Sequence, residues 1–257
     1  MSPDQVEELG AALARCRQSG TVSPLRLDRI ASAEDAEAVQ AAAVEAYGGV
    51  QRGYALRATT ALSRRLLRCD EPFFGPLLDS DLALSGGSLR LPYGVLGAGC
   101  TLTFAIGEPY PLDDGEISRE TASRAVAGCR LAIEVLGRRV PGSVPLNANT
   151  ATADFGLEVL HVQGPFIGRR GSLDLASKRG SVRLNGELVA NGCLRDVLGH
   201  PLEAIAWLAR LLKARGQGLD AGDFVSTGTC TGLLQVVPGQ TFEAEFGGLG
   251  SVKVSFE

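Results

Sequence analysis

Short β-type segments separated by glycine turns fill the chain from Gly53 to its end. Each segment concentrates or alternates apolar residues over a few positions and is bounded by turn-forming residues, as strands are. The segments are GYALRA, LALSGGSLRLP, CTLTFAIG, FGLEVLHVQG, GSVRLNGELVANG, DFVSTGT and TFEAEFGGLGSVKVSFE. One of them contains Asn185-Gly186, a dipeptide that favours a two-residue hairpin turn. This pattern restricts the chain to folds with a β-rich core.

Helical patterns surround and interrupt these segments. Apolar residues recur at helical spacing from Val6 to Cys16, and a second helix is predicted from the N-cap Ser32 to Gly48. Two more helices are predicted over residues 118–139 and 200–218. We therefore predict an α+β protein, with an N-terminal helical segment over residues 1–52 and one compact β-rich unit over residues 53–257.

Composition excludes several classes of function. The 257 residues carry a net charge of −4, so the chain lacks the basic surface that binds nucleic acid or anionic membrane. No run of about 18 apolar residues is present, and the N-terminus does not have the pattern of a signal peptide. The six cysteines are widely spaced and form no CxxC motif. We expect free thiols in a reducing cytoplasm.

Several segments together resemble the 2-keto-4-pentenoate hydratase and 4-oxalocrotonate decarboxylase group of the fumarylacetoacetate hydrolase family. They are GY at 53–54, DEPFFGPL at 70–77, LAIEVLGRRV at 131–140, LGHPLEAIAWLARLL at 198–212, LDAGDFVSTGT at 219–229 and PGQTFEAEFGGLGSVKVSF at 238–256. They occur in family order and cover most of the chain. The resemblance implies a rolled mixed β-sheet core, an N-terminal helical segment and a homo-oligomer.

The resemblance also implies a divalent metal, usually Mg²⁺ or Mn²⁺. The family holds it with a Glu-x-Glu pair on one strand and a third acid on a following helix. The third acid corresponds to Glu134, but the Glu-x-Glu pair corresponds to Gly99 and Thr101. A family lysine near the metal corresponds to Ala55, and the family glycine after it corresponds to Arg57.

No Asp or Glu occurs anywhere between Leu82 and Gly107. The Glu-x-Glu pair is therefore absent however this strand is aligned with the family. A magnesium ion held by one carboxylate mostly keeps its water shell. We therefore expect no metal cofactor. A family Asp-Asn pair corresponds to positions near Ala151 and Thr152, so it is also replaced in this chain. The substitutions therefore affect the whole site and not the metal ligands alone.

Three residues are candidates for catalysis. Glu134 is either an acid/base group whose pKa burial raises, or a helix carboxylate paired with an arginine such as Arg57, Arg130 or Arg138. Arg57 either replaces the metal as a carboxylate-binding cation or is itself solvated or ion-paired. Tyr54 either donates a hydrogen bond into the pocket or packs in the core.

Other residues are candidates for binding substrate. They are Thr227, Gly228 and Thr229 in the STGT loop, Cys100 and Thr101 in place of the metal strand, and Asp154, which alternatively caps a turn. Cys100 and Cys230 have no recognisable base nearby and are not expected to be nucleophiles. His200 is expected to be structural at a helix start, and His161 is expected to be exposed.

Three functions remain open at this point. The first is a metal-independent lyase, isomerase or cyclase that acts on a small enol, enone or polyene-type compound in aromatic catabolism or secondary metabolism. The second is a non-catalytic paralogue that partners a metal-intact hydratase or decarboxylase. The third is an ordinary Mg²⁺- or Mn²⁺-dependent hydratase with ligands recruited from Asp79, Asp81 or Asp154.

Overall fold

Two long strands, β5 (Val95–Ile106) and β6 (Val126–Gly137), pair antiparallel and form the centre of the protein. The computed structural model describes residues 1–112, 115–168 and 174–257. Its remaining strands are β1 (Gln51–Arg57), β2 (Phe73–Leu78), β3 (Leu82–Leu84), β4 (Ser88–Leu89), β7 (Glu158–Gln163), β8 (Ile167–Gly168), β9 (Arg179–Leu184), β10 (Glu187–Cys193), β11 (Phe224–Ser226), β12 (Thr241–Phe246) and β13 (Gly250–Phe256).

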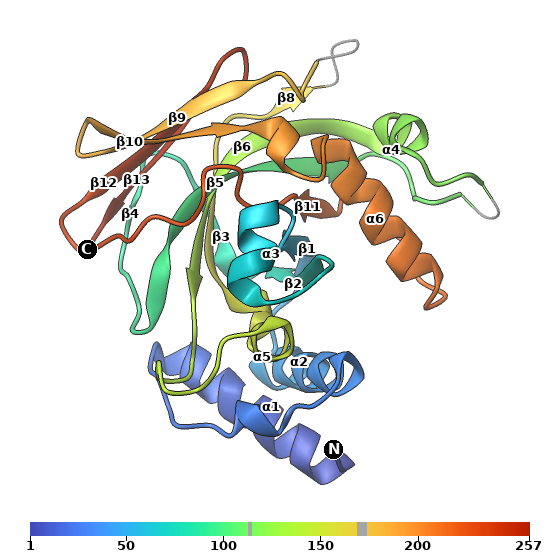
Figure 1. Ribbon diagram of the computed structural model, residues 1–257, viewed down its shortest axis with the longest axis vertical. Helices are drawn as coiled ribbons and strands as arrows, with labels where there is room; N and C mark the ends of the chain where they lie inside the picture. Colours follow the sequence, from blue (N-terminus) through green and yellow to red (C-terminus); the bar gives the residue numbers. More distant parts are fainter. Residues whose placement is uncertain (113–114, 169–173) are drawn as a thin grey trace.

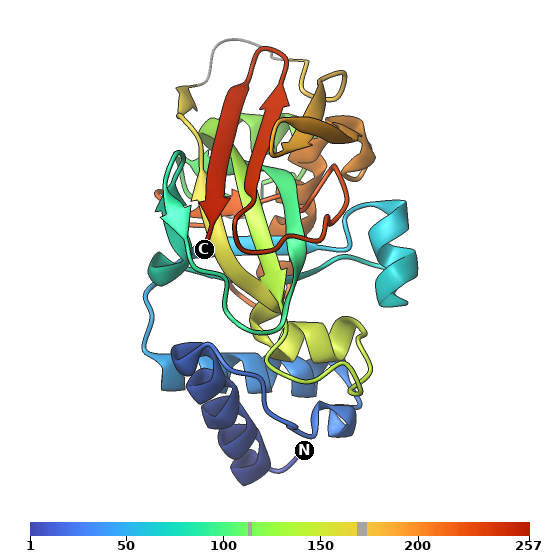
Figure 2. The same ribbon diagram turned by 90° about the vertical axis from the view of Figure 1, so that its left-hand side faces the viewer.

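These strands form two mixed sheets. The larger sheet has the order β2-β1-β11-β5-β6-β7-β3, with β8 also paired to β6. The smaller sheet has the order β10-β9-β12-β13-β4. Figure 2 shows the β12–β13 hairpin lying across β5 and β6 of the larger sheet. One hydrophobic cluster joins the two sheets and includes Leu102 and Ile133 from the larger sheet and Phe242 and Val254 from the smaller one.

Helices cover the ends and one side of the sheets (Figure 1). They are α1 (Pro3–Ser19), α2 (Ala33–Tyr47), α3 (Ala61–Leu67), α4 (Arg119–Ala125), α5 (Ala148–Ala153) and α6 (Pro201–Lys213). Helices α1 and α2 pack together beside α5 and share a second hydrophobic cluster with Leu78 and Phe155. None of the helices in the described ranges is long and apolar enough to cross a membrane.

Local signals in the sequence place several boundaries correctly. The Ser32 side chain accepts a hydrogen bond from the Asp35 N–H and caps α2, which ends at Gly48 with a φ of 77°. Asn185 and Gly186, with φ of 52° and 86°, form the predicted turn between β9 and β10. The α+β class is confirmed.

The predicted helix over residues 118–139 is largely wrong. Ser118 caps a helix as expected, but α4 ends at Ala125 and residues 126–137 form β6. Strand β6 pairs with β5 on one edge and with β7 and β8 on the other. A strand in this position is buried on both faces and reads as a continuous apolar run, which periodicity alone does not distinguish from a buried helix.

The close packing of α1 on α2 gives a testable prediction. A Cβ atom on Gly10 would lie 2.7 Å from the Ala42 Cβ and 2.8 Å from the Ala43 nitrogen. We expect Gly10→Val to lower the free energy of unfolding by about 1–3 kcal/mol, because the helices must separate to admit the side chain. Urea unfolding measures the change. Gly142→Ala is the control, since nothing lies within 4 Å of its Cβ position, and an equal loss in both variants would contradict the prediction.

Candidate active site

The register of β5 and β6 brings the candidate positions onto one face of the larger sheet. Gly99 lies opposite Glu134, and Thr101 lies opposite Ala132. Alternate residues of a strand point to opposite faces, so Gly99, Thr101 and Glu134 share a face and Cys100 points away from it. Glu134 is therefore on a strand, and the helical placement implied by the resemblance is wrong for this chain.

The guanidinium of Arg57 lies at the centre of this face. Its Nη1 donates to the Glu134 carboxylate at 3.1 Å and its Nη2 donates to the Glu158 carboxylate at 2.5 Å. Its other N–H groups donate to the backbone oxygens of Leu56 and Gly156, both at 2.9 Å. Arg57 is thus the ion-paired arginine that one interpretation of the sequence predicted, and Glu134 is its partner rather than that of Arg130 or Arg138.

Glu158 was missed by the sequence analysis. It begins β7 and is completely buried, like Glu134, so one guanidinium is shared by two carboxylates. A charged residue inside the apolar run FGLEVLHVQG was the signal that could have identified it. A buried charge is stable only when it is paired and hydrogen-bonded, so an isolated acid in a strand indicates a partner elsewhere.

His161 was predicted to be exposed, and it is completely buried. It lies opposite Glu134 in the β6–β7 pairing, and its Nε2 forms a 2.8 Å hydrogen bond with the Thr103 hydroxyl. Burial, with a smaller contribution from Arg57, lowers the pKa of His161 to about 3. The ring is therefore neutral at physiological pH.

Glu134 has a pKa of about 7, well above the usual value for a carboxyl group. Burial is the largest cause of this rise in pKa. The positive charge of Arg57 lowers the pKa, and the negative charge of Glu158 raises it further. The Thr229 N–H and the Ser226 hydroxyl lie near enough to lower this pKa. Neither has the geometry of a hydrogen bond to Oε1, which has no protein partner.

The predicted substrate loop covers this face closely. A Cβ atom on Gly99 would lie 2.4 Å from the Thr229 Oγ1 and 2.7 Å from the Gly232 carbonyl oxygen. The Thr227 hydroxyl donates to the Leu102 carbonyl at 2.9 Å, and the Thr229 hydroxyl donates to the Gly232 carbonyl at 3.0 Å. There is consequently no space for a glutamate at position 99 unless residues 229–232 move.

Three other candidates lie apart from Glu134. Tyr54 makes an edge-to-face contact with Phe74, with ring centroids 5.4 Å apart, and points away from Arg57 on β1. Cys100 is buried in the main hydrophobic cluster. Asp154 accepts a hydrogen bond from the backbone N–H of Arg139 at 2.7 Å and pairs with its guanidinium at 3.3 Å. The structure therefore brings together Glu134, Arg57, Thr101 and the Thr227–Thr229 loop. Tyr54, Cys100 and Asp154 lie outside this group.

A wider ionic network continues from Glu158 toward the N-terminal helices. The Glu158 carbonyl oxygen accepts hydrogen bonds from Arg17 and Arg139. Arg17 is also paired with Asp81, as Arg139 is with Asp154. These pairs link α1 to the strands behind the candidate site.

The residues of this site do not fit the three-carboxylate metal site that the resemblance implies. In the described part of the chain, no three His, Cys, Asp or Glu side chains are grouped so that they could hold a metal ion. Asp81 and Asp154 are engaged by arginines, and Asp79 accepts from the backbone N–H groups of Val50 and Ser80. A guanidinium already occupies the space beside Glu134.

Fold and site together define an α+β scaffold with a buried acid and arginine between its central strands. Residues 53–257 match the family described as fumarylacetoacetate (FAA) hydrolase C-terminal, and the chain belongs to this family. It is 30% identical to 2-keto-4-pentenoate hydratase of Paraburkholderia xenovorans (strain LB400), over the whole chain and 97% of that protein. It is 36% identical to 4-oxalocrotonate decarboxylase of Pseudomonas putida, over 42% of the chain and 40% of that protein.

A solved structure shows the same fold. The structure of 4-oxalocrotonate decarboxylase from Pseudomonas putida G7, complexed with magnesium and adipate, matches with a TM-score of 0.88 at 24% identity. The match covers all of this chain and 99% of that one. A second structure of that decarboxylase contains calcium and acetate. The predicted family and fold are confirmed, while the metals belong to those relatives.

The buried His161 gives a pH prediction. Its pKa is lowered from 6.5 to about 3 on folding, so the unfolded chain binds a proton below pH 6.5 that the folded chain does not. Stability from this residue is therefore complete above pH 6.5 and is lost as the pH falls toward 3. Between pH 7 and pH 5, wild type should lose about 2 kcal/mol more unfolding free energy than His161→Gln.

Denaturant unfolding at the two pH values measures this difference. The other buried groups are common to both proteins and cancel in the comparison. His200→Gln is the matched control, because that imidazole is only half-buried. Equal losses in wild type and His161→Gln would contradict a buried neutral His161.

Proposed function

We propose that this protein is a hydratase- or decarboxylase-like enzyme that acts without a divalent metal on a small enol, enone or polyene-type compound. The observation that carries the proposal is the direct contact between the Glu134 carboxylate and the Arg57 guanidinium at 3.1 Å. This fixed cation stands next to the one carboxylate that the family's metal site retains. Sequence similarity to hydratases and a decarboxylase supports the reaction class.

Glu134 would transfer the proton in this reaction. A carboxyl group with a pKa of about 7 is present in both protonation states near neutral pH, which suits a general acid/base. Hydration, dehydration, isomerisation, decarboxylation and cyclisation of such compounds all include a proton transfer to or from carbon or oxygen. Arg57 would stabilise negative charge that develops on a substrate oxygen, which is the electrostatic task of a cation in such a site.

Substrate would reach Glu134 only when residues 227–232 move away from β5. These residues are hydrogen-bonded to Leu102 and Cys100 of that strand, and Glu134 has no exposed surface beneath them. Closure of this kind would exclude water from a proton-transfer step and strengthen the electrostatic interaction with Arg57.

The six free cysteines support the expected reducing cytoplasm. A homo-oligomer, with or without a paralogous subunit, remains a prediction.

The same closed geometry favours a second candidate function, a non-catalytic paralogue. A completely buried ion pair without access is also what a structural role would require. Such a subunit would partner a metal-intact hydratase or decarboxylase. Copurification with such an enzyme and no turnover of any family substrate would support this second function over the first.

Replacing Glu134 tests the proposed enzyme directly. We expect Glu134→Gln to lower turnover by about 10²–10⁴-fold, because glutamine keeps the shape but cannot transfer a proton. The starting compounds are 2-keto-4-pentenoate and 2-hydroxyhexa-2,4-dienoate, named in the relatives, together with extended polyene analogues. Glu45→Gln, on the exposed face of α2, is the control. Full activity in Glu134→Gln would rule out the proton-transfer role.

Metal dependence is tested separately. We expect protein purified without chelator to hold much less than one equivalent of Mg²⁺ or Mn²⁺, and its turnover to survive exhaustive chelation. The physical reason is that Gly99 and Thr101 offer no carboxylate and that Arg57 competes for Glu134. Elemental analysis and activity after dialysis against chelator provide the measurements. A stoichiometric metal with chelator-sensitive turnover would instead identify an ordinary metal-dependent hydratase.

A further inference from the structure

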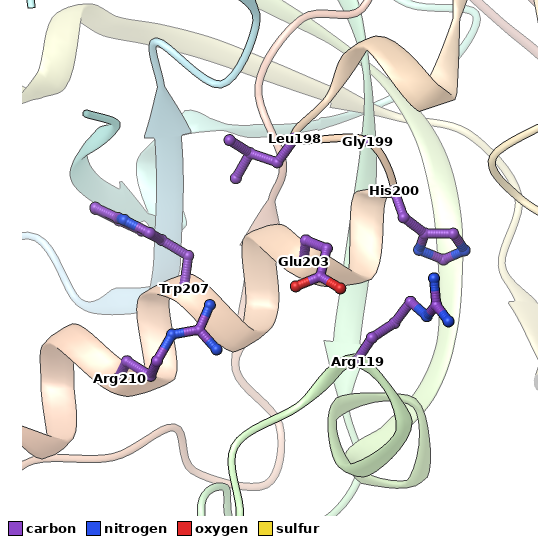
Figure 3. Close-up of a pocket in the computed structure, with 7 residues that line it drawn as sticks. All are labelled: Arg119, Leu198, Gly199, His200, Glu203, Trp207 and Arg210. Atoms are coloured by element: carbon purple, nitrogen blue, oxygen red, sulfur yellow. The ribbon is translucent and has the colours of Figure 1, made fainter. Parts of the chain in front are cut away.

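A groove on the outer side of α6 lies apart from Glu134. Its volume is about 430 Å³, which is the size of a small-molecule site. Its lining includes the N-cap residue of α6, His200, followed by Glu203, Trp207 and Arg210 on one face of that helix. Arg119, the first residue of α4, also lines it. In Figure 3, Trp207 and Arg210 lie at one end of this lining, and His200 and Arg119 lie at the other.

The His200 end of the groove presents hydrogen-bond donors. The Nδ1 of His200 accepts from the Leu202 N–H at 3.1 Å, so a neutral ring carries its proton on Nε2. Burial, with a smaller contribution from the charge of Arg119, lowers the pKa of His200, and the charge of Glu203 acts in the opposite direction. Figure 3 places the Arg119 guanidinium next to this ring. The Arg119 guanidinium also pairs with the Glu120 carboxylate at 3.0 Å. This pair is exposed and therefore weak, so a ligand carboxylate can replace Glu120 beside the His200 N–H.

Trp207 and Arg210 form the other end of the groove. Trp207 is half-buried and packs against the main hydrophobic cluster, which restricts its ring. Arg210 is tied to the loop before α4 by a hydrogen bond from Nη1 to the Ile117 carbonyl at 3.2 Å. Trp207 lines the groove, and an indole ring in this position can stack on a planar group.

Glu203 lies between the two ends in Figure 3. It is the acidic residue of the lining, and its oxygens are acceptors that would repel a second carboxylate and accept from a hydroxyl group. The groove thus carries a donor pair at one end, an acceptor in the middle and an aromatic face at the far end.

We propose that this groove binds a small planar carboxylate that carries a hydroxyl group. The carboxylate contacts Arg119 and the His200 Nε2–H, the hydroxyl donates to Glu203, and the planar body lies on Trp207. The site is independent of the reaction proposed at Glu134, because that carboxylate is buried inside the larger sheet and does not line the groove.

Trp207 makes the proposal directly measurable, because it is the one tryptophan of the chain. Its fluorescence is recorded while the full-length protein is titrated with 3-hydroxybenzoate as the probe. Benzoate, which lacks the hydroxyl, and 3-hydroxybenzyl alcohol, which lacks the carboxylate, serve as comparison compounds. We expect saturable changes for the two carboxylates, tighter binding of the hydroxylated one, and no saturation by the alcohol.

Two variants assign the contacts. Arg119→Gln should weaken binding of both carboxylates about tenfold or more, because it removes a charge-assisted hydrogen bond. Glu203→Leu, which removes the acceptor as well as the charge, should tighten benzoate binding and remove the preference for the hydroxylated probe. Arg15→Gln, on the exposed side of α1, is the control and should bind as wild type does.

Several results would overturn the proposal. No saturable change of Trp207 fluorescence with 3-hydroxybenzoate would exclude the site, and so would equal binding of the carboxylate and the alcohol. Equal affinities for wild type and Arg119→Gln would show that the change arises elsewhere. Glu134→Gln should bind the probe as wild type does, so a failure of the groove and a failure of the proposed catalysis are distinguishable.

Discussion

The interaction on which the central part of the structure depends is the burial of Arg57 between two carboxylates. The Arg57 side chain is only 3% exposed, and removing its charge from water costs several kcal/mol unless its hydrogen bonds are replaced. Glu134, Glu158 and two backbone carbonyls replace them. The three strands that carry these side chains are therefore held in one arrangement, and loss of either acid would leave charge without a full partner.

The same burial gives two neighbouring groups different acid–base behaviour. Glu134 and His161 lie opposite each other on β6 and β7, and burial favours the neutral form of each. The carboxyl pKa rises to about 7 while the imidazole pKa falls to about 3. Glu134 is therefore the group of the two that titrates near neutral pH, although histidine is the residue usually expected to do so.

A fixed guanidinium differs from an exchangeable metal ion in what it permits. A magnesium ion accepts several oxygen ligands at once and holds a chelating substrate, whereas a guanidinium donates hydrogen bonds in one plane. Two of the hydrogen bonds that Arg57 donates already go to the carboxylates of Glu134 and Glu158. The reaction we propose at Glu134 therefore uses proton transfer with electrostatic help, and the donors of the α6 groove lie outside that site.

The sequence alone determined the family, the α+β class, the helix caps at Ser32 and Ser118 and the Asn185-Gly186 turn, because these depend on local geometry or on motifs within short segments. It also determined that no carboxylate exists between Leu82 and Gly107. Only the tertiary structure decided that residues 126–137 are a strand, that Glu158 completes the site and that His161 is buried. These outcomes depend on contacts between segments far apart along the chain, which no local pattern encodes. Strand β6 pairs with β5 and β7, His161 bonds with Thr103 58 positions away, and Arg57 bonds with Glu158 101 positions away.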